Sequence, residues 1–214
     1  MCHDTPTKKH SGQKAKVSTQ MRSRAWLAAV ILLTCLSHGQ QTESKTESAS
    51  TSGAAEKYFT DTVLVDQDGK EQRFYSDLIK GKVVIINAMF ATCKDSCPMM
   101  EANFARIQKW LGPRLGPDVH LISISVDPET DTPAVLKQYG GRFDAMPGWY
   151  FLTGKKQNVE LILRKLGLYV ENKQDHLNLF LIGNDRTGLW KKSLGVSDSE
   201  KLIGVVKSVL DDNR

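Results

Sequence analysis

Four short apolar runs stand out in the hydrophobic pattern of this chain, at residues 83–90, 119–126, 149–152 and 179–182. The first is apolar at every position except Asn87 rather than alternating, which is typical of a strand covered on both faces of a sheet. The runs are separated by segments with helical periodicity. They therefore predict the central strands of one sheet.

The segments between and after these runs carry helix start and stop signals. Gly112 and Pro113 end an amphipathic stretch, Thr132 and Pro133 offer an N-cap and a first helical residue, and Ser197 offers a further N-cap. Helices are predicted at residues 98–111, 133–139, 157–166 and 198–210.

Before the first run, residues 62–65 and 73–75 flank an Asp-Gly turn signal at residues 66–70, which predicts an N-terminal β-hairpin. Strand–helix alternation followed by a second hairpin and a closing helix is typical of an α/β fold. We expect a mixed central sheet flanked by helices.

The charge pattern separates the N-terminus from the rest of the 214 residues. Residues 1–39 contain six Lys or Arg and one Asp, which accounts for the whole net charge of +5, and the remainder holds 23 basic and 23 acidic residues. This leaves no basic face for nucleic acid. The basic start is followed by an apolar run at residues 25–36, and together they are typical of an export signal. The apolar run is short for a membrane span.

We therefore expect three regions: an export signal or membrane anchor at residues 1–39, a disordered linker at 40–57 and a folded domain at 58–214. Cleavage before Gln40, lipid attachment at Cys35 and an uncleaved anchor all remain open, as does a true start at Met1 or Met21. The expected location is the periplasm or another extracytoplasmic face of the membrane.

Removal of such a leader leaves Cys93 and Cys97 as the cysteines of the domain, and His120 and His176 as its histidines. On a helical turn, a Cys-x3-Cys spacing places both thiols on the same side. Such a pair can close a disulfide or bind one soft metal ion. A purely structural disulfide is a weak explanation, because so short a loop restrains the unfolded chain little.

Three motifs in order carry a family resemblance: Phe-x-x-Cys-x3-Cys-Pro at residues 90–98, Val-Asp-Pro-Glu-x-Asp-Thr-Pro at 126–133, and Asp-His at 175–176. In this combination the chain resembles the Sco/SenC family. The resemblance implies a thioredoxin-like fold and a copper-binding metallochaperone that assists assembly of the dinuclear copper centre of cytochrome c oxidase.

The resemblance further implies one copper per chain, held by Cys93, Cys97 and His176. Its partner would be a copper-receiving oxidase subunit or another copper chaperone, and we expect a monomer. Lys94, Ser96 and Leu177 depart from the usual residues beside these ligands, although no ligand position is lost.

A different class of function also fits the thiols. In an exported thiol–disulfide oxidoreductase, Cys93 would attack and Cys97 would resolve, so both would be catalytic, and whether the chain is an enzyme stays open. His176 discriminates between the two functions, since a simple dithiol reductase does not need it.

Other residues near the motifs are interpreted more simply. His120 is expected on the surface, and Met100 in the core. The role of Met99 is left open. The acidic residues of the second motif are expected to cap the helix that follows rather than to bind metal; they are Asp127, Glu129 and Asp131. The carboxylate of Asp175 could orient the ring of His176.

Overall fold

The computed structural model describes residues 55–213. A seven-stranded mixed sheet has the strand order β2-β1-β5-β4-β3-β6-β7, with β3, β4 and β5 parallel and the other neighbouring pairs antiparallel. The strands are β1 Val63–Asp66, β2 Glu71–Arg73, β3 Val83–Met89, β4 Val119–Ser125, β5 Trp149–Thr153, β6 Leu179–Asn184 and β7 Leu189–Leu194.

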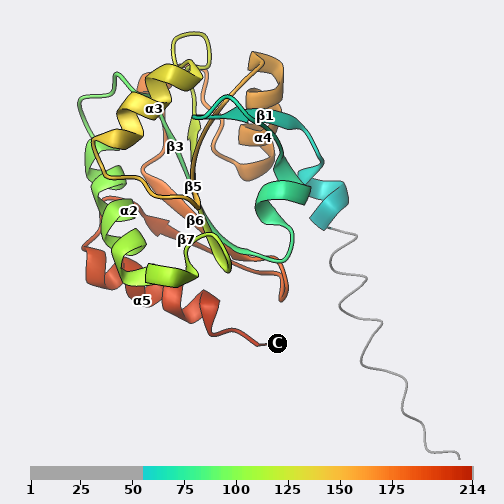
Figure 1. Ribbon diagram of the computed structural model, residues 1–214, viewed down its shortest axis with the longest axis vertical. Helices are drawn as coiled ribbons and strands as arrows, with labels where there is room; N and C mark the ends of the chain where they lie inside the picture. The colour runs from blue at the N-terminus through green and yellow to red at the C-terminus, as the bar shows by residue number, and fades with distance from the viewer. Residues whose placement is uncertain (1–54, 214) are drawn as a thin grey trace, which may run out of the picture. The chain divides into compact units, whose positions relative to one another are not determined.

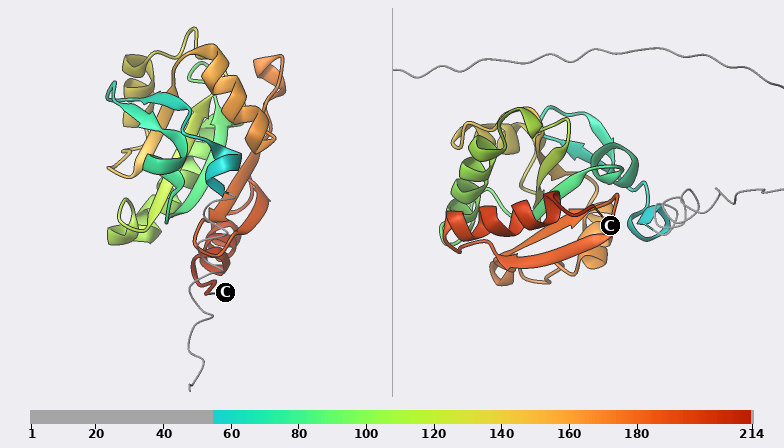
Figure 2. Two further views of the ribbon diagram at one scale, coloured as in Figure 1. Left: turned by 90° about the vertical axis from the view of Figure 1, so that its right-hand side faces the viewer. Right: turned by 90° about the horizontal axis from the view of Figure 1, so that it is seen from below.

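Helices cover both faces of this sheet (Figure 1). The α-helices are α2 Cys97–Leu111, α3 Pro133–Gly141, α4 Lys156–Leu166 and α5 Ser199–Leu210, and the short helical turns are η1 Phe74–Ile79, η2 Gly112–Arg114 and η3 Lys173–Asp175. Side chains of α2, α3 and α5 share one hydrophobic cluster, and those of η1 and α4 share the other. Helix α5 packs against β6 and β7 (Figure 2).

The continuous apolar run of β3 is explained by these two clusters. Val83, Ile85 and Met89 face the cluster under α2 and α5, whereas Val84 and Ile86 face the cluster under α4. All seven residues of β3 are buried. Because both faces of the strand are covered, neither set of alternating side chains has to be polar.

The expected mixed α/β sheet with an N-terminal hairpin is confirmed, and most helix starts agree with their signals. Thr132 accepts a hydrogen bond from the amide of Val135, as an N-cap does. The closing helix differs: Asp198, not Ser197, is its N-cap and accepts from the amides of Glu200 and Lys201.

The described chain opens with a helical segment at residues 55–59, in which Phe59 is buried, so three helical residues precede the boundary expected at residue 58. The expected export segment and most of the expected linker lie outside the described residues. Within residues 55–213, no helix is both long enough and apolar enough to cross a membrane.

The expectation of a surface position for His120 is wrong. Its side chain lies in β4, is 4% exposed, and its two ring nitrogens lie 2.9 Å from the carbonyl oxygen of Leu78 and 3.0 Å from that of Gly116. Burial lowers the pKa of His120. His120 therefore joins two backbone segments and is not part of the group that the cysteines form with His176.

Candidate metal centre

Cys93 and Cys97 lie where β3 ends and α2 begins. Cys97 is the first residue of the helix, whereas Cys93 lies in the preceding loop, where its amide donates a hydrogen bond to the carbonyl oxygen of Phe90 at 3.1 Å. The expectation that both thiols sit on one helical turn is therefore wrong. The fold of the loop, rather than helical spacing, brings the two sulfur atoms together.

His176 reaches the same point from a distant part of the chain, between η3 and β6. Its Nε2 atom lies 2.9 Å from Sγ of Cys97 and 3.5 Å from Oγ of Ser96. The imidazole ring packs edge-on against Phe90, with 5.4 Å between ring centroids. The antiparallel pairing of β6 with β3 places the start of β6 beside the end of β3, and so brings His176 to the cysteines.

The three side chains form one compact group. Sγ of Cys93, Sγ of Cys97 and a ring nitrogen of His176 all lie within 4.8 Å of one another. Among the described residues, this is the only group of three or more Cys, His, Asp or Glu side chains that could hold a metal ion. Cys93 is 8% exposed, Cys97 is fully buried and His176 is 9% exposed, so the group lies just beneath the surface.

Burial determines the protonation of this group. Desolvation raises the pKa of the Cys97 thiol strongly, and a backbone hydrogen bond from Phe90 opposes it. Desolvation also lowers the pKa of His176, which keeps the imidazole neutral at neutral pH. A neutral imidazole has a free lone pair, whereas the Cys97 thiol must lose its proton before it can bind a metal.

Asp131 supports the loop that carries Cys93. Its carboxylate accepts hydrogen bonds from the amide of Ala91, at 3.1 Å to Oδ2, and from the hydroxyl of Ser125, at 2.6 Å. The side chain is fully buried, and burial raises its pKa. Asp131 therefore holds the cysteine loop rather than capping α3, which corrects the simpler expectation.

Asp127 supports the segment that carries His176. Its carboxylate forms an ion pair with Lys173 of η3, at 2.6 Å, and the Lys173 ammonium lies 5.4 Å from the centre of the Phe90 ring. Lys173 thus fixes the segment three residues before His176. Asp175, by contrast, forms no described hydrogen bond to His176, and the Nδ1 atom of His176 has no partner among the described residues.

The remaining expectations for this region concern the two methionines. Met100 is fully buried in the core, as expected, and Met99 is 54% exposed at the start of α2.

Sequence reasoning missed Glu101 and Tyr139. Glu101 follows Cys97 by one helical turn, is fully buried, and receives hydrogen bonds from Asn87 and Ser123. Tyr139 of α3 is 1% exposed, and its hydroxyl has no hydrogen-bond partner among the described residues. The signal that could have found Glu101 was Asn87, a polar residue inside an otherwise apolar strand.

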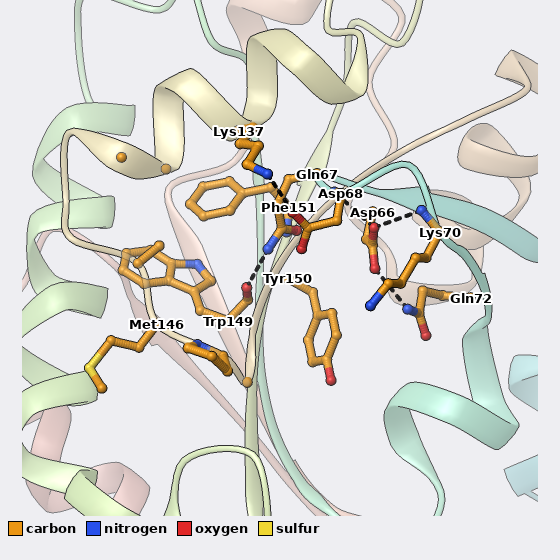
Figure 3. Close-up of a pocket in the computed structure, with 15 residues that line it drawn as sticks. Asp66, Gln67, Asp68, Lys70, Gln72, Lys137, Met146, Trp149, Tyr150 and Phe151 are labelled. Carbon is orange, nitrogen blue, oxygen red and sulfur yellow. Dashed lines mark hydrogen bonds and ion pairs between the residues drawn. The ribbon is translucent and has the colours of Figure 1, made fainter.

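A separate hollow of about 560 Å³ lies beside β1, β5 and α3, and its lining excludes the cysteines (Figure 3). Gln67 projects into it and bonds to both the carbonyl oxygen of Trp149 and the amide of Phe151, which extends the short β1–β5 ladder. The Asp66 carboxylate accepts from the amides of Asp68 and Lys70. Gln67 and Asp66 therefore bond to backbone groups around this hollow and stabilise the fold.

Comparison with known proteins agrees with the geometry. The SCO1/SenC family model matches residues 50–210, which is most of the chain. The chain belongs to the SCO1/SenC family. A SCO1 protein homolog of Bacillus subtilis is 38% identical over 94 residues, which cover 44% of this chain and 47% of the relative. The chain spans about half the length of the curated relatives it matches.

Two solved structures of this family share the fold. BsSco, a member of the Sco family of cytochrome c oxidase assembly proteins in which a disulfide switch was identified, matches with a TM-score of 0.58 and 30% identity, over 69% of this chain and 90% of that chain. Yeast Sco1 with copper bound matches with a TM-score of 0.58 and 27% identity, over 71% of this chain and 91% of that chain. The thioredoxin-like expectation is thereby confirmed.

Proposed function

We propose that this chain is a copper metallochaperone that binds one copper ion through Cys93, Cys97 and His176. The observation that carries the proposal is the convergence of two sulfurs and one imidazole nitrogen within 4.8 Å. Two thiolates and one neutral imidazole form a soft, three-ligand set that suits Cu(I). The copper-bound structure of yeast Sco1 supports the same choice of metal.

Loading requires the thiols in their reduced form. Both cysteines are free in this structure, and metal binding displaces a proton from each thiol that is protonated. The neutral His176 needs no deprotonation. A Cys93–Cys97 disulfide removes both sulfur ligands at once, so the redox state of the pair decides whether copper can bind.

The buried site suits transfer to a protein partner. Cys93 and His176 are slightly exposed, and Cys97 lies behind them. Copper held by Cys93 and His176 at the surface can be taken by an incoming ligand before Cys97 releases it. We infer that the recipient is a copper-receiving oxidase subunit or another copper chaperone, in keeping with the assembly role named for BsSco.

We further propose that residues 1–39 export or anchor the chain, that residues 40–57 act as a linker, and that the domain works as a monomer at an extracytoplasmic face. The basic start and the short apolar run support this arrangement. Mass spectrometry of native material tests it. A terminus at Gln40 indicates cleavage, a lipidated Cys35 a lipoprotein, and an intact Met1 or Met21 an uncleaved anchor.

The decisive test of copper binding is reconstitution of the reduced protein followed by elemental analysis. We expect one copper per chain, and none in the Cys93→Ser/Cys97→Ser double variant. The matched control is Met99→Leu, which removes an exposed thioether beside the site and should keep full stoichiometry. Equal copper retention by the double variant would refute the proposal.

A thiol–disulfide oxidoreductase remains the second candidate, because Cys93 is more exposed than Cys97 and a disulfide switch is known for BsSco. His176→Ala separates the two functions. A metallochaperone should lose copper affinity in this variant while the Cys93–Cys97 disulfide still forms and opens. Unchanged copper binding with a normal thiolate-to-copper absorption would favour the oxidoreductase.

A further inference from the structure

A hollow of about 720 Å³ lies between the C-terminal end of α4 and strand β7. Helix α4 ends at Leu166, and its main strand contacts are with β1 and β4 rather than with the outer strands. The hollow is lined by Leu181 of β6 and Trp190 of β7, beside Phe59, whose ring centroid lies 5.2 Å from that of Trp190. The outer part of this sheet face is thus covered by the short segment 55–59 instead of a long helix (Figure 2).

The lining of this hollow contains four cations and no carboxylate. Two of the cations come from the last turn of α4 and two from β7; they are Arg164, Lys165, Lys191 and Lys192. Residues 40–214 hold equal numbers of basic and acidic residues, so this is a local concentration of positive charge. The nearby carboxylates outside the lining are Glu56, in the segment 55–59, and Glu160, which lies 3.9 Å from Arg164.

Two of the four cations are available to an outside anion. Within residues 55–213, Lys165 and Lys192 take part in no ion pair. The Lys165 ammonium lies 5.4 Å from the centre of the Tyr58 ring, and the Tyr58 hydroxyl donates a hydrogen bond to the carbonyl oxygen of Lys165 at 2.6 Å. Tyr58 is 54% exposed. The edge of the hollow therefore combines an exposed aromatic ring with ammonium groups.

Local roles explain each pair of cations separately but not their arrangement. Basic residues in the last turn of a helix interact favourably with its dipole. Lysines on an edge strand hinder pairing with a strand of another molecule. Neither role requires both pairs to surround one apolar hollow, or requires Tyr58 and Trp190 to lie at the same place.

The composition of this surface matches that of a membrane interface. Tyrosine and tryptophan rings lie at the level of the lipid headgroups, and lysine and arginine are attracted to anionic lipids. The described chain also begins at this hollow, at Ala55. Residues 37–54, which separate Ala55 from the apolar run at 25–36, reach at most about 60 Å when extended. This second argument rests on the proposed anchor, and it favours a lipid surface over an acidic protein.

We propose that this hollow and its edge dock the domain onto the surface of an anionic phospholipid bilayer. Lys165 and Lys192 contact lipid phosphate groups, and the rings of Tyr58 and Trp190 lie among the headgroups. No residue that lines the hollow belongs to the candidate metal centre, so docking does not use the copper ligands. The inference goes beyond copper binding and does not depend on it.

The test is hydrogen–deuterium exchange of the full-length protein with phospholipid vesicles. One set of vesicles contains phosphatidylcholine alone, and the other contains equal parts of phosphatidylcholine and phosphatidylglycerol. With the anionic vesicles, backbone exchange should slow in three peptides around the hollow, at residues 55–60, 163–169 and 188–194. The slowing should be absent with neutral vesicles and should disappear at about 1 M salt, where the Debye length is about 3 Å.

The variant Lys165→Gln/Lys192→Gln removes two charges from the edge of the hollow. Each basic residue near an anionic surface contributes about fivefold to binding, so the ratio of docked to free domain, given by the slowing of exchange, should fall roughly thirtyfold. The matched control Lys109→Gln/Lys201→Gln makes the same change in net charge at exposed positions of α2 and α5, and should keep the protection. Tyr58→Ala keeps every charge and should weaken docking while leaving its dependence on lipid charge.

Exchange without vesicles should be the same in all variants, which shows that the fold is kept. Equal protection on neutral and anionic vesicles overturns the proposal, as does full protection in Lys165→Gln/Lys192→Gln or an equal loss in the control. Absence of protection on anionic vesicles overturns it too, and leaves an acidic protein segment as the occupant of the hollow. Retention of the whole chain by neutral vesicles tests the proposed anchor separately, and copper stoichiometry tests the metallochaperone.

Discussion

The buried Glu101 should make the stability of this domain depend on pH in a way that one substitution removes. The ordinary pKa of a glutamate is 4.5, and in the folded protein burial raises that of Glu101 to about 7. The folded state therefore holds the proton more tightly than the unfolded state. Its contribution is fully present below pH 4.5 and is lost as the pH rises to 7.

The size of the effect follows from these two values. At about 1.4 kcal/mol for each pH unit between 4.5 and about 7, ionisation of Glu101 lowers the free energy of unfolding by about 3 kcal/mol at pH 8. Glu101→Gln carries no charge at any pH. Its amide can still accept from Asn87, so the shape of the site and one hydrogen bond are kept.

Urea unfolding of the reduced, copper-free protein at pH 5, 6, 7 and 8 measures this difference. We expect the variant and the wild type to be nearly equal at pH 5, and the variant to be more stable by about 3 kcal/mol at pH 8. The other titrating groups, including Asp131 and Asp185, are present in both proteins and cancel in the comparison. A difference that stays constant from pH 5 to pH 8 would refute the reasoning.

Two further predictions concern support of the site and packing of the sheet. Asp131→Ala leaves the amide of Ala91 without its acceptor and should weaken copper affinity by roughly tenfold, as measured by competition with a chelator; unchanged affinity would contradict a supporting role. Gly183→Ala should lower the free energy of unfolding by about 2 kcal/mol, because the added Cβ would lie 2.5 Å from the ring of Trp190. Gly204→Ala in α5 should instead stabilise the protein by about 0.5–1 kcal/mol, because its added Cβ meets nothing within 4 Å. If thermal unfolding shows the same change in the free energy of unfolding for both substitutions, the contact with Trp190 does not destabilise the Gly183→Ala variant.

Local signals in the sequence determined most of the secondary structure. The apolar run of β3, the N-cap at Thr132 and the turn at Gly69, with its positive φ of 79°, all follow from rules that act over a few residues. For these features, the residue type and its spacing carry enough information. The set of Cys93, Cys97 and His176 came instead from the resemblance to the Sco/SenC family, because no local rule connects His176 with Cys97, which lies 79 residues before it.

Only the tertiary structure decided which polar residues lie in the core and what they contact. Glu101 follows the core residue Met100 in an amphipathic helix, and the sequence alone does not say whether the edge of the apolar face is covered. The packing of α2 on β3 and β4 places Asn87 and Ser123 against Glu101. His120 becomes a buried link between two backbone segments for the same reason. Burial and hydrogen-bond partners depend on contacts between segments far apart in the chain, and no local pattern contains them.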